Sequence, residues 1–355
     1  MFWKRTLVGL FIGTFVPLFL PVSVSAYEIG THAYLTNEAF SIFNKNFSSQ
    51  KISSELRDFL VDGARKEDDI PRWMNHFYDP VNEHGLTPDV SVDPINIGNW
   101  DASKVWAKDT ENQNGLMYKV PATIASMLNA VQKRKISEIS DETDFTWQEA
   151  IRYYANGENE KAMFALGHVL HLIQDTSVPD HTRNDPHSEG SPYESFANKY
   201  SLTSIDKELI KRLNNKPIPV FPDLESYFKE LAIYSNNNFY SKDTIGIQSG
   251  YKLPEPVEYE TRDGFTFSLN KDSEGYFNLF KQKKLKSVFS TKGEIIFDSK
   301  DILSDYWSRL STKAVQYSVG AMKLFFDEAE KAKNDPSFVR TKEKSFIAAL
   351  VEGIG

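Results

Sequence analysis

The feature that most constrains this chain is the stretch 167–187, GHVLHLIQDTSVPDHTRNDPH, which holds four of the seven histidines. The preceding residues repeat apolar side chains at helical spacing, so we expect a helix over 159–175. Positions three, four and seven apart share one face of a helix. His168, His171 and Asp175 have those spacings and therefore form a polar stripe on a helix that is otherwise largely apolar.

The residues after this stripe add further nitrogen ligands. Pro179 is expected to end the helix, and the chain then turns with His181 and His187 close behind. Imidazole nitrogen and carboxylate oxygen suit zinc, and an open coordination position suits catalysis. Paired histidines on a helix are often surface or supporting residues, but two further histidines and an aligned aspartate favour a metal site here. The sequence contains no G-x-S-x-G, H-E-x-x-H or P-loop motif.

The first 26 residues have the composition of an export signal. A short basic segment, MFWKR, precedes an apolar run of about 14 residues, which is shorter than the ~20 needed to span a bilayer. Val24, Ser25 and Ala26 fit the small-x-small rule for signal peptidase. We therefore expect cleavage before Tyr27 and a secreted or periplasmic protein.

Composition excludes several other classes of function. The formal net charge is -8 and no lysine- or arginine-rich block is present, so duplex nucleic acid is not an expected partner. The chain has no cysteine, which excludes a thiol nucleophile, a disulfide framework and a zinc-thiolate site.

The rest of the chain is expected to be mostly helical. Residues 67–100 are rich in Pro, Asn and Asp and predict a long structured loop. Residues 255–300 alternate in polarity and contain Asp263-Gly264 and Lys292-Gly293 turns, which predicts a small β-rich insertion. Further helices are predicted over 31–46, 52–68, 122–134, 146–157, 204–215, 223–240 and 301–333. The sequence thus predicts an all-α domain over 27–335 with a 255–300 insertion, followed by a tail, 336–355.

The segment LGHVLHLIQDTSVPDH (166–181) resembles the core motif of the bacterial zinc-dependent phospholipases C, which share a fold and a trinuclear zinc site with fungal single-strand-specific nucleases. GTHAYL (30–35), NHFYDP (75–80) and the closing helix are similar to other blocks of that family, in the same order. The resemblance covers most of residues 27–200 and 301–330. It implies a multi-helix zinc phospholipase C-like bundle and about three zinc ions per chain.

The resemblance also implies the ligand of each zinc ion. The first ion would lie between Asp68, His76, His171 and Asp175. Asp175 would bridge to a second ion, which would also be bound by His32 and by the amino group and carbonyl of Tyr27. His181, His187 and Glu194 would bind the third ion.

Some positions depart from the family pattern or allow a second role. The family usually begins its mature chain with Trp where this chain has Tyr27, but the ligand atoms there are main-chain atoms. His187 and Glu194 are seven residues apart where the phospholipases have four, and Ser191 to Glu194 also fits a helix-capping box, so Glu194 is either a ligand or a cap. Trp73 matches an aromatic that faces the lipid headgroup, or else it anchors the 67–100 loop. His168 matches no ligand position, so it should orient a ligand or simply pack.

The expected activity is hydrolysis of a glycerophospholipid to diacylglycerol and a phosphorylated headgroup, with Asp68 as a ligand and as the acceptor of the water's proton. The alternatives are a zinc nuclease acting on single strands and a non-catalytic protein that uses zinc only for stability. The expected partner is phospholipid, with peripheral membrane contact, and the protein is expected to be a monomer.

Overall fold

The structure is a computed structural model. It describes residues 29–69, 72–87, 99–119, 144–187, 190–203, 207–214, 216–242, 244, 254–283 and 295–335. The export signal, Tyr27, the predicted helix 122–134, the Lys292-Gly293 turn and the tail 336–355 lie outside the described residues.

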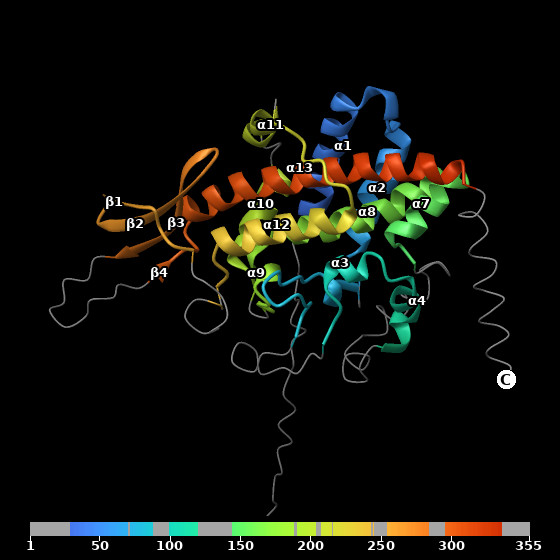
Figure 1. Cartoon of the computed structure of the whole chain (residues 1–355). Helices are drawn as coiled ribbons and strands as arrows, with labels where there is room; N and C mark the ends of the chain where they lie inside the picture. The colour runs from blue at the N-terminus through green and yellow to red at the C-terminus, as the bar shows by residue number, and fades with distance from the viewer. Residues whose placement is uncertain are drawn as a thin grey trace, which may run out of the picture.

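The described chain is a helical bundle with one small sheet, as the sequence predicts (Figure 1). Helix α8 (Asn159–Asp175) has the predicted bounds, and α1, α2, α7, α11, α12 and α13 each lie within two or three residues of the prediction. The helices are α1 (Ile29–Asn46), α2 (Ser54–Lys66), α3 (Ser103–Trp106), α4 (Thr110–Lys119), α7 (Trp147–Ala155), α8, α9 (Pro179–Thr182), α10 (Pro192–Thr203), α11 (Lys207–Leu213), α12 (Leu224–Asn238) and α13 (Lys300–Lys333), with 3-10 helices η1 (Ser48–Gln50) and η2 (Arg72–Asn75).

Helices α2 and α8 pack with their backbones in contact. A Cβ added to Gly63 would lie 2.0 Å from the Phe164 carbonyl oxygen, and one added to Gly167 would lie 2.2 Å from that of Leu60. No side chain larger than hydrogen fits at either position without moving a backbone. This contact sets the end of α2 beside the polar stripe of α8.

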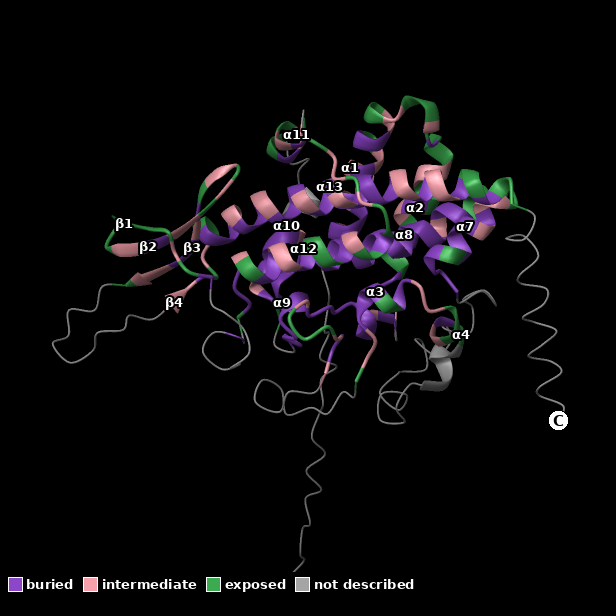
Figure 2. Ribbon diagram, in the orientation of Figure 1, coloured by how far each residue is buried: buried purple, intermediate pink, exposed green. Residues whose placement is uncertain are grey.

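Helix α13 is 34 residues long and runs along the bundle, with the sheet at its beginning and α7 at its end (Figure 1). Its inward face is buried, and α8 is buried along most of its length (Figure 2). Apolar side chains of α13 such as Trp307, Val315 and Phe325 join one continuous core with those of α1, α7 and α8. No helix of the described residues is both long and apolar enough to cross a bilayer.

The sheet contains β1 (Glu258–Arg262), β2 (Phe265–Asp272), β3 (Gly275–Lys283) and β4 (Ile295–Ile296), antiparallel in chain order. The predicted Asp263-Gly264 turn joins β1 to β2, and both of its residues have the positive φ that such a turn requires (52° and 79°). Strand β3 lies within the predicted β-rich insertion over 255–300, although the alternating segments that indicated the insertion lie on either side of it. It packs on α13 and buries Phe277 and Leu279 there, so tertiary contact accounts for this strand.

One local prediction is wrong. Pro179 does not end α8, because that helix ends at Asp175 and Pro179 begins the separate helix α9. Proline suits the first position of a helix, and it holds the preceding Val178 in an extended conformation. Helices α3 and α4 were also missed. The predicted loop over 67–100 contains η2 and an isolated bridge between Asp79 and His84 in its described part.

Candidate metal centre

Four predicted ligands meet in one buried cluster, which we term the helix group: Asp68, His76, His171 and Asp175. His171 Nε2 and His76 Nδ1 each lie 3.1 Å from Asp175 Oδ2, and they lie 3.3 Å from each other. Asp68 Oδ1 lies 3.7 Å from His171 Nε2 and 3.8 Å from His76 Nδ1. Ligand atoms around tetrahedral zinc are separated by about 3.3 Å, given zinc–ligand distances near 2.0 Å. The donor atoms of the helix group therefore have the spacing of a metal site.

The second carboxylate oxygen of Asp175 faces two other imidazoles. Asp175 Oδ1 lies 3.3 Å from His32 Nε2 and 3.2 Å from His181 Nδ1. The His32 ring is stacked on that of His171, with centroids 3.5 Å apart. One carboxylate thus faces four histidines, two through each oxygen, which is the arrangement expected of a bridging ligand.

A second cluster, the turn group, contains His181, His187 and Glu194. Glu194 Oε1 lies 3.4 Å from His181 Nε2, and Glu194 Oε2 lies 3.2 Å from His187 Nε2. The Glu194 backbone N–H donates to Ser191 Oγ, so Ser191 caps the helix, whereas neither carboxylate oxygen of Glu194 accepts a hydrogen bond from the described residues. The Glu194 carboxylate therefore belongs to the cluster, and the cap of this helix is Ser191.

Four of the five histidines in the centre are held from behind, each through the ring nitrogen that points away from the clusters. His171 Nδ1 lies 2.6 Å from the Ala64 carbonyl, and His76 Nε2 lies 3.2 Å from that of Glu67. In zinc sites the second ring nitrogen of a ligating histidine commonly donates to such an acceptor, which turns the other nitrogen toward the metal. The remaining two acceptors are the Asp185 carbonyl for His187 Nδ1, at 2.8 Å, and Gln174 Oε1 for His32 Nδ1, at 2.9 Å.

Several polar atoms in the centre are buried without hydrogen bonds from the described residues. They include both oxygens of Asp175, Oδ2 of Asp68 and both ring nitrogens of His181. Buried polar atoms without hydrogen bonds are rare and call for an explanation such as an ion. A divalent cation bound among these donors fits that requirement.

The electrostatics of the centre differ from residue to residue. Although burial raises it, the pKa of Asp175 is held well below its usual range by the surrounding imidazoles. Burial, together with nearby carboxylates, raises the pKa of Asp68 well above its usual range. Burial lowers the pKa of His76 to about 3, whereas Glu194 outweighs burial and raises the pKa of His187 to about 10.

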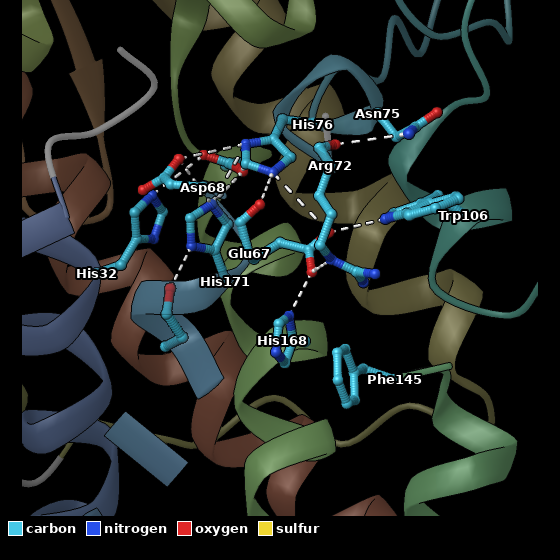
Figure 3. A network of polar contacts seen from close by, with 12 residues as sticks. His32, Glu67, Asp68, Arg72, Asn75, His76, Trp106, Phe145, His168 and His171 are labelled. Atoms are coloured by element: carbon cyan, nitrogen blue, oxygen red, sulfur yellow. Dashed lines mark hydrogen bonds and ion pairs between the residues drawn. The ribbon is translucent and has the colours of Figure 1, made fainter. Parts of the chain in front are cut away.

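Sequence reasoning missed Glu67, which lies directly behind the helix group. Its buried carboxylate accepts from Arg72 Nε at 2.7 Å and from Trp106 Nε1 at 2.7 Å, and it lies 2.5 Å from His168 Nδ1 (Figure 3). His168 also stacks on Phe145, with ring centroids 4.3 Å apart. The structure therefore places His168 outside the clusters, both packed and hydrogen-bonded. The sequence signal for Glu67 was its position beside Asp68.

Every predicted ligand within the described residues lies in or beside these clusters. His32, Asp68 and His171 also form a group whose donor atoms are within 4.8 Å of one another. Trp73 lies in η2, half-buried, three residues before His76. Asp180 and Asp185, which sequence reasoning did not single out, lie close enough to His187 to form another acidic group. Whether each residue binds a metal stays a prediction.

Comparison with known proteins gives only distant structural similarity. No family model matches the sequence, and no curated protein matches it. Among solved structures, an alpha toxin from Clostridium absonum is similar at 15% sequence identity with a TM-score of 0.39. The match covers 84% of this chain and 64% of the toxin's chain, so this chain spans less than two thirds of the toxin's length. A likeness at this level leaves the family assignment as a resemblance.

Proposed function

We propose that this chain is an exported zinc-dependent phosphodiesterase, and specifically a phospholipase C that hydrolyses glycerophospholipids. The observation that carries the proposal is the Asp175 carboxylate, each oxygen of which faces a different pair of imidazoles. Asp175 and these imidazoles would hold two cations close together, and paired cations would suit phosphodiester hydrolysis. The sequence motifs at 30–35, 75–80 and 166–181 support phospholipid as the substrate.

Bound zinc ions would neutralise the phosphoryl oxygens, lower the pKa of a water toward ~7 and stabilise the leaving alkoxide. Asp175, with its low pKa, stays ionised and keeps its negative charge between the two sets of imidazoles. Asp68 has one oxygen toward the helix group and a buried second oxygen without a hydrogen bond, which suits it to accept a proton from the attacking water. The products would be diacylglycerol and a phosphorylated headgroup.

The proposal extends to the protein's surroundings. Cleavage before Tyr27 would release a secreted or periplasmic monomer that meets phospholipid at a membrane surface. The α-amino group of Tyr27 would then complete the site of His32. Trp73, half-buried beside the helix group, would contact the lipid headgroup.

The decisive experiment offers the zinc-loaded protein choline lipid, sphingomyelin and single-stranded DNA side by side. We expect release of phosphorylated headgroup from the choline lipid, and loss of that release after chelation. Cleavage of the DNA alone would replace the proposal with a single-strand nuclease. Zinc-dependent stability without hydrolysis of any of the three would indicate a non-catalytic role for the metal.

A further inference from the structure

Glu67 is a buried acidic residue that lies in neither metal cluster. It follows the last residue of α2, and its side chain has no exposed surface. Three donors converge on its carboxylate from three different segments: Arg72 from η2, Trp106 from α3 and His168 from α8. Burial of a carboxylate is costly unless it is paired and hydrogen-bonded, and this one has both forms of compensation.

The groups around Glu67 are themselves fixed. Arg72 donates from Nη2 to Gln113 Oε1 at 3.1 Å, and its guanidinium lies over the rings of Trp106 and Phe145, 5.0 and 5.2 Å from their centroids (Figure 3). The same Gln113 oxygen accepts from the backbone N–H of Phe145 at 2.8 Å. The polar network is therefore a closed, packed unit behind the helix group.

This network connects to the helix group through the main chain of Glu67. The Glu67 carbonyl lies 3.2 Å from His76 Nε2, which directs Nδ1 of that ring toward the cluster. Asp68 is the next residue, so its position also follows from that of Glu67. Two of the four donors of the helix group thus depend on one residue at a helix end, where chains otherwise tend to fray.

We propose that Glu67 is a positioning residue for metal: its side-chain network fixes the main chain so that Asp68 and His76 face His171 and Asp175. The inference rests on the proposed function, because it assumes that the helix group binds zinc. Outer partners of metal ligands typically contribute 10- to 100-fold to metal affinity. The role of Glu67 is therefore measurable as zinc affinity, without any assay of hydrolysis.

The test variant is Glu67→Gln, which keeps the size of the side chain but removes its charge and presents an amide N–H to Arg72 and His168. The full chain is produced with its own export signal, isolated after processing, stripped of metal and titrated with zinc against a chromophoric chelator. We expect the affinity for the most tightly bound zinc ion to fall about 10- to 100-fold. Trp106→Phe removes one donor but keeps the ion pair, so the same affinity should fall less.

The matched control is Glu149→Gln. Glu149 is also a buried glutamate paired with an arginine, Arg152, but it lies on α7 and is a member of neither metal group. Glu149→Gln should lower the free energy of unfolding while leaving the affinity for every zinc ion unchanged.

Equal zinc affinity in Glu67→Gln and the unsubstituted protein would overturn the positioning role, as would equal weakening in Glu149→Gln. If Glu67→Gln does not fold, the zinc affinity of Trp106→Phe is compared with that of the unsubstituted protein instead. Equal affinity would then overturn the positioning role. An unsubstituted protein that binds no zinc would instead refute the proposed function and this inference with it. Zinc binding without hydrolysis would refute only the function.

Discussion

The two metal-ligand clusters are built on different kinds of structure. The helix group takes His171 and Asp175 from one buried helix and Asp68 from the end of α2, whose backbone contacts that helix. The turn group takes His181 from the four-residue helix α9 and His187 from the turn that follows. His187 has a φ of 38°, in the left-handed region that non-glycine residues rarely adopt. A long packed helix places His171 and Asp175 without strain, whereas His187 lies in a strained segment, so we expect the helix group to hold its metal more tightly.

The largest effect on hydrolysis should follow from substitution of Asp175, whose carboxylate faces both pairs of imidazoles. Asp175→Asn removes one negative charge from between four imidazoles, and with it the bridge between two cations. We expect hydrolysis to fall by more than about 100-fold, since even outer partners of a metal contribute 10- to 100-fold. Glu194→Gln, which affects the turn group alone, should lose less. Rates measured at matched zinc content that are equal in the two variants would contradict the bridging role.

Chelation should separate the two groups. During dialysis against a weak chelator, we expect one zinc to leave before the others, because the turn group lacks the rigid helical support of the helix group. Glu194→Gln should lower the zinc content from about three per chain to about two, because loss of a ligand lowers the affinity of that site. The measurement is zinc per chain against dialysis time. The first zinc to leave belongs to the helix group if Glu67→Gln makes that zinc leave sooner. Such a result would show that the helix group, and not the turn group, binds its metal more weakly.

Glycine substitutions test the supports of the two groups. In Gly167→Ala the new Cβ would lie 2.2 Å from the Leu60 carbonyl oxygen, so α2 and α8 must separate. Such overpacking typically lowers the free energy of unfolding by about 1–3 kcal/mol, occasionally more. Gly190→Ala, next to the turn group, meets no atom within 4 Å and has only its φ of 92° to accommodate, at a cost of about 1–2 kcal/mol.

Denaturant unfolding of the zinc-free proteins gives the two free energies. Zinc titration then shows which group each change affects: Gly167→Ala should weaken the helix-group step and Gly190→Ala the turn-group step. The reverse assignment would show that the α2 and α8 contact does not position Asp68.

The smallest effect concerns the stability of the fold in acid, to which His168 contributes from behind the helix group. Burial lowers the pKa of His168 from 6.5 to about 4, so the folded protein keeps this ring neutral where the unfolded chain would protonate it. The stability contribution of neutral His168 is therefore complete above pH 6.5 and is lost as the pH falls toward 4. His168→Gln can still donate to Glu67 but does not titrate, so its unfolding free energy should fall less over that interval. Parallel pH profiles for the two proteins would contradict the buried neutral histidine.

Much of the fold and of the candidate site could be predicted from the sequence. Helix α8 has the predicted bounds because its apolar repeat continues without a break, and the His171 and Asp175 spacing places both side chains on one face by helix geometry alone. The Asp263-Gly264 turn was predictable because its residue types tolerate positive φ. The bundle with a small sheet follows from the same local patterns.

Tertiary structure alone decided how these parts combine. The helices around Trp106, α3 and α4, gave no clear local signal in the sequence. Glu67 looked like one more acidic residue at a helix end, and only the folded chain brings Arg72, Trp106 and His168 to its carboxylate. Periodicity can fix which face of a helix a side chain takes, because that depends on neighbours three and four residues away. Which atoms meet across helices depends on how closely their backbones approach, and here two glycines, Gly63 and Gly167, set that distance.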